Sequence, residues 1–159
     1  MSKTKAVWCG SKGNCQNKLC PDLQLQWANN FTLLGVEFDS NLELIHTNFS
    51  NKLANLKKIL SSWAYRYMTP FGKITIIKTL GLSIFSHLAL VLPDTDKDLI
   101  KKLETSLFAF LWDNKPDKIR RDDTKLEQKQ GGIGMPDVLK FWTAFKFSWL
   151  RRLLTSLDS

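Results

Sequence analysis

Two adjacent aspartates, Asp122 and Asp123, are the residues of this sequence whose type and spacing could hold metal ions. Paired aspartates bind the two divalent metals in enzymes of nucleotidyl transfer. Such a site also needs a third carboxylate on a strand and apolar surroundings, whereas this pair follows Arg120 and Arg121 in a polar segment. We therefore interpret the pair as a solvated charge cluster and predict no catalytic residue.

Other potential ligands and nucleophiles also lack partners in the sequence. His46 and His87 are far from each other and from any cysteine. The glycines of residues 131–134 match neither G-x-x-x-x-G-K-[ST] nor G-x-G-x-x-G, so they indicate a tight turn rather than a phosphate loop. The sequence has three cysteines, Cys9, Cys15 and Cys20. Their number and spacing do not supply the four ligands of a zinc site. We predict no metal ion and no cofactor, and we expect reduced thiols.

The charge of the chain favours a polyanionic partner, because the net charge is +8 and the pI is near 9.5. Residues 44–93 contain six Lys or Arg and no Asp or Glu. Basic side chains beside small hydroxyl side chains can contact phosphate oxygens, which a nearby carboxylate would repel. If each of the six neutralised one phosphate, affinity would fall about 10³-fold between 50 and 200 mM salt. The alternative interpretation is a solvated helix face.

The first third of the chain has the pattern of a small β element. Residues 3–9 and 23–27 each read as a short strand, and residues 31–38 read as a third strand, interrupted by Gly35. A glycine inside a strand suggests a bulge or a close approach of another backbone. We therefore predict a β element in residues 1–40, too small to be stable alone.

The period then changes to that of helices. A narrow apolar stripe at spacings of three and four predicts a first helix, with Phe49, Leu53, Leu56, Leu60, Trp63 and Tyr67. Thr69 is a candidate N-cap and Pro70 a first-turn residue of a second helix over residues 70–91. Its apolar face comprises Ile74, Ile77, Gly81, Ile84, Phe85 and Leu88, and its far face holds Thr75, Thr79, Ser83 and Ser86.

Two further helices follow. Asp94 or Thr95 is expected to cap a helix that ends near Trp112, before a polar linker over residues 113–123. Pro136-Asp137 opens a last helix to about Leu154, whose stripe is Val138, Phe141, Trp142, Phe145, Trp149 and Leu153. The predicted fold class is mainly α, a helical bundle with a small N-terminal β element.

Residues 63–88, WAYRYMTPFGKITIIKTLGLSIFSHL, resemble the thumb of the reverse transcriptases of LINE-type non-LTR retrotransposons, in which the pattern W-x-x-R-x-[LM]-T-x-x-G-[KR] recurs. Residues 110–121, FLWDNKPDKIRR, and residues 131–153, GGIGMPDVLKFWTAFKFSWLRRL, are similar to the connector that follows this thumb. Residues 3–11, KTKAVWCGS, resemble the late palm of this family. Residues 31–39, FTLLGVEFD, resemble its primer-grip strand pair. The order and spacing of these motifs carry more weight than any one of them.

The resemblance implies a helical thumb-like bundle that closes over a template–primer duplex and presents a helix start and a lysine to the nucleic-acid backbone. It implies a domain division into residues 1–40, 41–113 and 114–159. Leu34 and Gly35 correspond to the primer grip, and Lys5 to a palm lysine near the incoming nucleotide. The residues implied to contact the backbone of the nucleic acid are Arg66, Thr69, Gly72, Lys73, Lys78, Arg120 and Arg121.

The departures from the family are equally specific. The fingers, the catalytic metal-binding aspartates, an endonuclease domain and the Cys/His-rich terminal segment have no counterpart in this sequence. We therefore expect a truncated fragment of an RNA-directed DNA polymerase, left by a transposable element, that holds template–primer nucleic acid without catalysis. The alternatives are a stand-alone basic helical protein that binds RNA or DNA, and an interaction module that docks a protein through its aromatic face.

The last predicted helix carries more apolar area than one face can bury, with five aromatic residues between Phe141 and Trp149. We expect this helix to bind missing parts of a polymerase or a second copy of the chain. The N-terminal residues show no charged-then-apolar leader, and no apolar run approaches 18 residues. The expected location is therefore intracellular, in the cytoplasm or nucleus, with no membrane partner.

Overall fold

The computed structural model describes residues 5–7, 26–33, 35–39, 45–92 and 96–157. Its elements are mainly helices with short strands near the N-terminus, which confirms the predicted fold class. The chain forms two compact units, Met1–Ser50 and Asn51–Ser159. The division into residues 1–40, 41–113 and 114–159 stays a prediction.

The described residues of the N-terminal unit include two pairs of short strands. Strand β1 (Lys5–Ala6) pairs in parallel with β2 (Gln26–Trp27). Strands β3 (Asn30–Leu33) and β4 (Val36–Asp39) form an antiparallel hairpin. The prediction of one bulged strand over residues 31–38 is therefore wrong: Gly35 has a φ of 77°, which makes it a turn residue.

A buried amide joins this hairpin to the start of helix α1 (Ile45–Ala64) within the same unit. The Asn48 side chain is 4% exposed, and its Nδ2 donates to the Glu37 carbonyl at 2.6 Å. The Glu37 N–H donates in turn to Asn48 Oδ1 at 2.9 Å. Asn48 therefore satisfies both backbone polar groups of Glu37 in β4.

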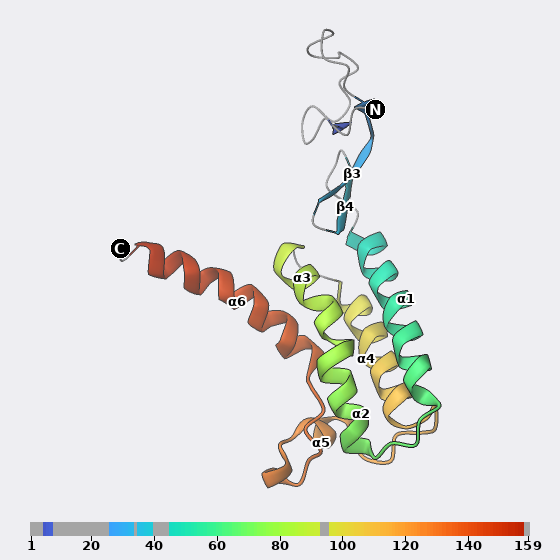
Figure 1. Cartoon of the computed structure of the whole chain (residues 1–159). Coiled ribbons are helices and arrows are strands. Elements are labelled where there is room, and N and C mark those ends of the chain that lie inside the picture. The colour runs from blue at the N-terminus through green and yellow to red at the C-terminus, as the bar shows by residue number, and fades with distance from the viewer. Residues whose placement is uncertain (1–4, 8–25, 34, 40–44, 93–95, 158–159) are drawn as a thin grey trace. The chain divides into compact units, whose positions relative to one another are not determined.

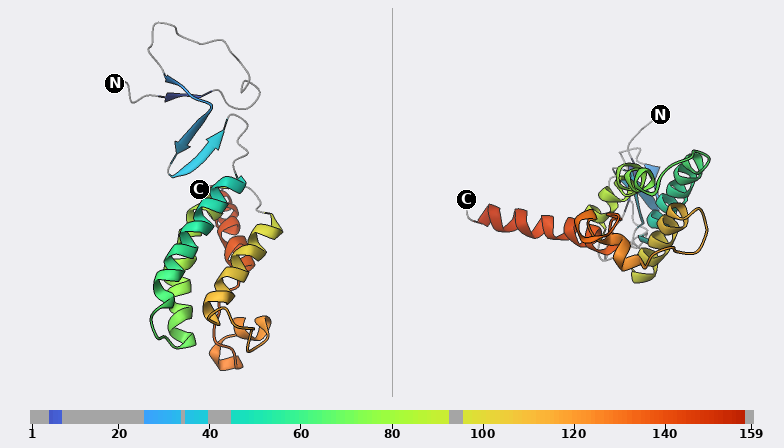
Figure 2. Two further views of the ribbon diagram at one scale, coloured as in Figure 1. Left: turned by 90° about the vertical axis from the view of Figure 1, so that its right-hand side faces the viewer. Right: turned by 90° about the horizontal axis from the view of Figure 1, so that it is seen from below.

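Four helical segments form the core of the second unit: α1 from Asn51 onward, α2 (Pro70–Ile76), α3 (Ser83–Val91) and α4 (Lys97–Leu111). Figures 1 and 2 show these helices side by side. The first helix ends at Ala64, so the predicted stripe is wrong in its last member, Tyr67, which lies in the following loop. The cap of α4 is also not the predicted one, since Asp96 Oδ1 accepts from Asp98 N–H at 3.1 Å.

A wide turn separates α2 from α3 within the predicted helix of residues 70–91. Residues Ile77–Gly81 form the π-helical segment η2, in which Leu82 N–H donates to the Ile77 carbonyl at 2.8 Å. Five of the six residues predicted for the apolar face are buried. The exception is Ile84, which is only half-buried, whereas Leu82, next to the wide turn, is buried. At Gly81 an added Cβ would already lie 3.4 Å from Leu56 Cδ1, which marks the close approach of η2 to α1.

The chain after α4 is compact although it contains little regular structure. It comprises α5 (Arg121–Lys125) and the 3-10 turn η3 (Gln128–Gln130), followed by a loop to α6 (Val138–Leu157). The predicted turn at residues 131–134 is confirmed, and it allows a close approach: a Cβ on Gly132 would lie 2.1 Å from the Leu126 carbonyl oxygen. Only glycine fits at this position without moving the backbone.

Helix α6 packs on α3 through residues as far as Trp149, and its C-terminal end points away from the bundle (Figure 1). Val138 and Trp142 are buried, and the Trp149 indole N–H donates to the Leu90 carbonyl at 2.9 Å. Lys146 Nζ donates to the Leu92 carbonyl, so side chains of α6 satisfy carbonyls at the end of α3. From residue 147 onward, α6 exposes Phe147, Trp149, Leu150, Leu153 and Leu154.

Among the described residues, no single helix combines the length and the apolar content needed to cross a membrane. Only the bent pair Pro70–Gly81 and Ser83–Val91, with 42° between its halves, reaches that composition together. A mostly buried core helix meets the same criterion, and Ile77, Phe85 and Leu88 of this pair are fully buried.

Candidate nucleic-acid interface

Helix α2 begins after the joint with α1, at the predicted cap residue Thr69. Thr69 has extended backbone angles, and its Oγ1 accepts a hydrogen bond from Gly72 N–H at 3.3 Å. Pro70 occupies the first turn, where its missing N–H leaves no donor unpaired. Thr69 and Gly72 are thus committed to capping α2, and any contact with a phosphate would be additional to this role.

Lys73 lies inside the protein, which corrects the expectation that the joint presents this lysine to solvent. Its side chain is 6% exposed, and its Nζ lies 2.5 Å from Asp113 Oδ1 and 3.4 Å from the Leu111 carbonyl oxygen. The ammonium group also lies 5.8 Å from the centre of the Phe110 ring. A charge this buried needs partners, and the end of α4 supplies them.

Residues 44–93 contain no acid, but the fold places the Asp113 carboxylate next to Lys73 of this segment. Asp113 follows α4 in the left-handed region, at a φ of 55°, together with Asn114 at 58°. Asn114 N–H donates to the Ala109 carbonyl at 2.7 Å, which closes the C-terminal turn of the helix. Lys73 and Asp113 neutralise each other. The net positive charge between α1 and α2 therefore comes from Arg66.

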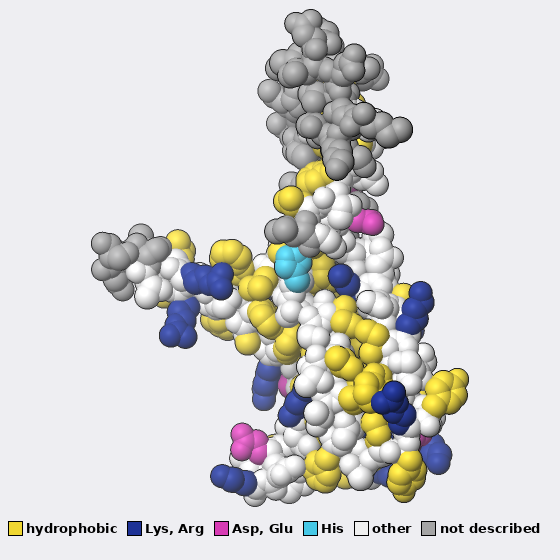
Figure 3. Space-filling model, in the orientation of Figure 1, with side chains coloured by type: hydrophobic (Ala, Val, Ile, Leu, Met, Phe, Trp, Pro, Cys, Tyr) yellow, Lys and Arg dark blue, Asp and Glu magenta, His cyan; other side chains and the backbone are white. Residues whose placement is uncertain are grey.

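The basic residues exposed on helices α1 to α3 and their joint are Lys57, Lys58, Arg66 and Lys78. Lys57 lines a groove of about 560 Å³ between α1 and α4. Lys78 lines a second groove of about 430 Å³, together with Lys129 and one acid, Glu127. Figure 3 shows Lys and Arg side chains spread over one face of this unit, with few Asp or Glu among them.

The predicted hydroxyl face is present, but its hydroxyl groups already donate hydrogen bonds to backbone carbonyls of their own helix. Thr75 Oγ1 donates to the Phe71 carbonyl at 3.1 Å, and Thr79 Oγ1 donates to the Thr75 carbonyl at 2.8 Å. Ser83 and Ser86 donate to carbonyls three residues earlier in the same way. A hydroxyl of this kind would have to rotate away from its helix before it could donate to a phosphate.

Two tyrosines of the joint were missed as candidates from the sequence. Tyr65 is 93% exposed and Tyr67 105% exposed, on either side of Arg66. The Arg66 guanidinium lies 4.2 Å from the centre of the Trp63 ring. The 3.6-residue period favoured Tyr67 as a core position, and the aromatic-basic alternation Y-R-Y was the signal available for a different interpretation.

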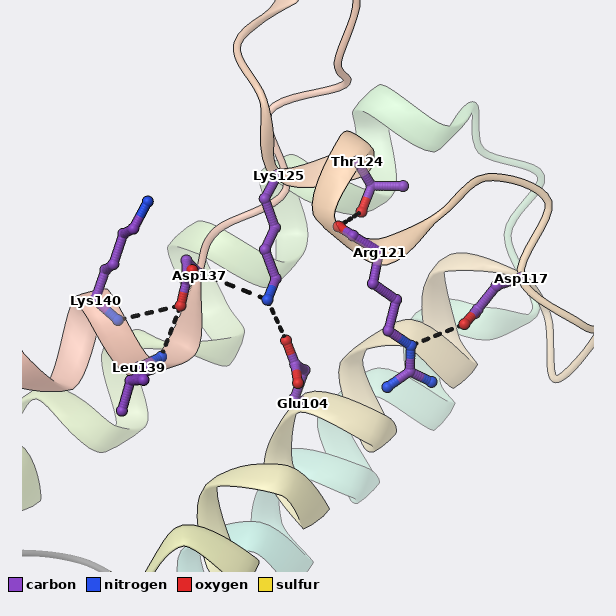
Figure 4. Close-up of polar contacts among 8 residues, drawn as sticks. All are labelled: Glu104, Asp117, Arg121, Thr124, Lys125, Asp137, Leu139 and Lys140. Atoms are coloured by element: carbon purple, nitrogen blue, oxygen red, sulfur yellow. Dashed lines mark hydrogen bonds and ion pairs between the residues drawn. The ribbon is translucent and has the colours of Figure 1, made fainter.

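Arg120 and Arg121 have different environments at the start of α5. Arg120 is exposed, whereas Arg121 is partly buried. The Arg121 Nε lies 2.8 Å from Asp117 Oδ2 (Figure 4). The Arg121 guanidinium also lies 4.6 Å from the centre of the Phe108 ring. Arg121 is therefore held within the fold. Asp122 and Asp123 are exposed in the first turn of α5, in agreement with a solvated charge cluster.

A second charged cluster ties α5 to α4 and α6. Lys125 Nζ lies 2.7 Å from Glu104 Oε1 and 3.9 Å from Asp137 Oδ2 (Figure 4). Asp137 Oδ1 accepts from the N–H groups of Leu139 and Lys140, which caps α6. Burial lowers the pKa of Lys125, but the hydrogen bond to Glu104 and the nearby carboxylates outweigh it, so this pKa is raised above 10.5.

The remaining predicted residues belong to the N-terminal unit. Gly35 is the turn residue of the β3–β4 hairpin, and Leu34 lies outside the described residues. The backbone of Lys5 forms β1, while its side chain lies outside the description, as do the three cysteines. Within the described residues, no group of three or more His, Cys, Asp or Glu is placed to hold a metal ion. No protein-family model matches the chain.

Proposed function

We propose that the helical unit binds nucleic acid along its sugar–phosphate backbone and performs no catalysis. The sequence motifs that resemble a retrotransposon reverse transcriptase favour the thumb and connector of such an RNA-directed DNA polymerase as its counterpart. The ligand under this proposal is a template–primer duplex. The proposal concerns binding by Asn51–Ser159 and assigns no role to the N-terminal unit.

The observation that supports the proposal best is the exposure of Lys57, Lys58, Arg66 and Lys78 on a run of fifty residues without an acid. Exposed cations can approach phosphates without first breaking internal ion pairs. Lys73 does not meet this condition, and Lys52 is half-buried. With four contacts in place of six, affinity should fall about 10²-fold between 50 and 200 mM salt, less steeply than the sequence alone suggested.

Fluorescence anisotropy with the full chain and a labelled RNA–DNA hybrid duplex tests this proposal at 50 and 200 mM salt. Lys78→Glu should weaken binding and reduce the salt slope by about 1, because it removes one phosphate contact. Lys102→Glu, at an exposed position of α4, changes the net charge equally and should leave the slope unchanged. Folded protein that does not bind the hybrid at 50 mM salt, or equal effects of the two variants, would refute the proposed interface.

A second candidate function is a protein-interaction module, favoured by the apolar second half of α6. This surface is separate in sequence from the basic helices, so the two functions predict different sensitive residues. Loss of nucleic-acid binding when basic residues of α1 to α3 are substituted supports the nucleic-acid interface. A salt-independent association with a protein that needs Leu150 and Leu154 supports the interaction module.

A further inference from the structure

Tyr65, Arg66 and Tyr67, here called the tyrosine loop, form an exposed aromatic surface that capping of α2 does not require. Both tyrosine rings are almost fully exposed, whereas most large aromatic side chains of a folded protein are at least partly covered. The loop also lines a pocket of about 280 Å³ that reaches Lys73 and Asp113. The side chains of the loop are thus accessible from solvent and adjoin a concave surface.

The positive charge in this loop is positioned rather than mobile. Arg66 N–H donates to the Trp63 carbonyl at 3.1 Å, and the guanidinium stacks on the Trp63 ring. Such a cation–π contact holds the charge beside the tyrosines while leaving its outer face open. The Asp113 carboxylate at the pocket is neutralised by Lys73, so it does not cancel the charge of Arg66.

Exposed aromatic rings next to a fixed cation suit one kind of ligand in particular. Unpaired nucleobases stack on aromatic side chains, while the phosphates between them are attracted to a neighbouring Arg. Protein interfaces are also rich in Tyr and Arg, but their buried centres are depleted of charged residues. The pocket beside this loop is lined by three charged residues, Arg66, Lys73 and Asp113. The loop chemistry therefore favours a single strand over a protein.

From this arrangement we infer that the tyrosine loop is a stacking site for unpaired bases of single-stranded RNA or DNA. The inference rests on the proposed function, which it extends from a duplex backbone to an adjoining unpaired strand. Base stacking is independent of sequence, so the site would recognise the absence of pairing rather than particular bases.

The test compares three labelled probes with the full chain: a 12-nucleotide adenylate RNA, an abasic strand of equal length and the RNA–DNA hybrid duplex. Tyr65→Leu/Tyr67→Leu keeps the apolar bulk and removes the rings, while Tyr65→Phe/Tyr67→Phe keeps the rings. We expect the Leu variant to lose about 5- to 150-fold in affinity for the adenylate RNA for each lost stack. The Phe variant, and Phe147→Leu at an exposed ring of α6, should bind as the wild type does.

Each outcome separates the two proposals. Equal affinity of the wild type for the adenylate and abasic strands would overturn the stacking site, as would equal loss of all three probes in the Leu variant. Unchanged adenylate binding by the Leu variant, with the duplex still bound, would overturn the stacking site and leave the proposed function standing. Failure of every probe to bind folded wild type would refute the proposed function itself.

Discussion

Lys73 illustrates how a single residue can be right in type and wrong in role. The motif around it predicts a lysine in the first turns of a helix, and the structure has one there. Its partner, Asp113, is forty residues away in sequence, so no local pattern predicts that the side chain turns inward. The sequence thus located the joint correctly, while the side-chain direction depended on a tertiary contact.

Charge reversal at two lysines of the same segment should therefore give opposite results. Lys73→Glu places a carboxylate in a buried site beside Asp113, and we expect a loss of about 3–5 kcal/mol in the free energy of unfolding. Lys78→Glu, at an exposed position, should change it by less than about 0.5 kcal/mol. Urea unfolding followed by tryptophan fluorescence measures both. Equal stability of the two variants would mean that Lys73 swings freely into solvent.

At the scale of elements, the sequence predicted best the features that depend on near neighbours. The Thr69 cap, Pro70 in the first turn and the start of α6 at Asp137 are all set within four residues, and all are confirmed. The cap of α4 was placed one residue or more too early, because Asp94, Thr95 and Asp96 are all of a type that caps helices. The wide turn η2 escaped prediction, and its last residue, Gly81, lies against Leu56 of α1 and Leu107 of α4, which are distant in sequence.

The Lys125 cluster joins three such elements, so it should make stability depend on pH. Because the folded-state pKa of Lys125 is raised above 10.5, its stabilising contribution is present below that pH and lost as pH rises through the folded value. We expect Lys125→Met to lower the free energy of unfolding at pH 8 by about 1 kcal/mol, and the difference from wild type to shrink above pH 10.5.

The same substitution at Lys102, exposed on α4, is the matched control. Urea unfolding at pH 8, 9.5 and 11 gives the comparison, and only the difference between wild type and each variant is used, since other groups titrate in this range. A Lys125→Met effect that stays constant to pH 11 would show that packing of the side-chain stem, and not its charge, holds α4, α5 and α6 together.

The helical unit as a whole has two candidate binding surfaces: the basic helices and the apolar end of α6. The sequence predicted excess apolar area on the last helix, and α6 does expose Phe147, Leu150 and Leu154. The first half of the same stripe is covered, with Val138 and Trp142 buried. The periodicity could not show where along the helix this covering would stop, because that depends on the length of α3.

We expect this exposed half-helix to make the chain associate with itself at micromolar concentration. Leu150→Glu/Leu154→Glu should raise the dissociation constant at least about tenfold, because charges would have to be buried in the contact. Thr143→Glu/Ala144→Glu, at exposed positions of α6, adds the same charge and should have little effect. Sedimentation velocity over a concentration series measures this. A wild-type chain that sediments as a monomer throughout would contradict the prediction.

The wide turn η2 also has a consequence for comparing this chain with relatives. A π turn amounts to one residue inserted into an ordinary helix, and here it brings Leu82 rather than Ile84 into the core. In a related protein with a straight helix, an alignment should therefore need a one-residue gap between positions 77 and 82. The same protein should not need an apolar side chain at the position of Leu82, so gap and side chain would vary together.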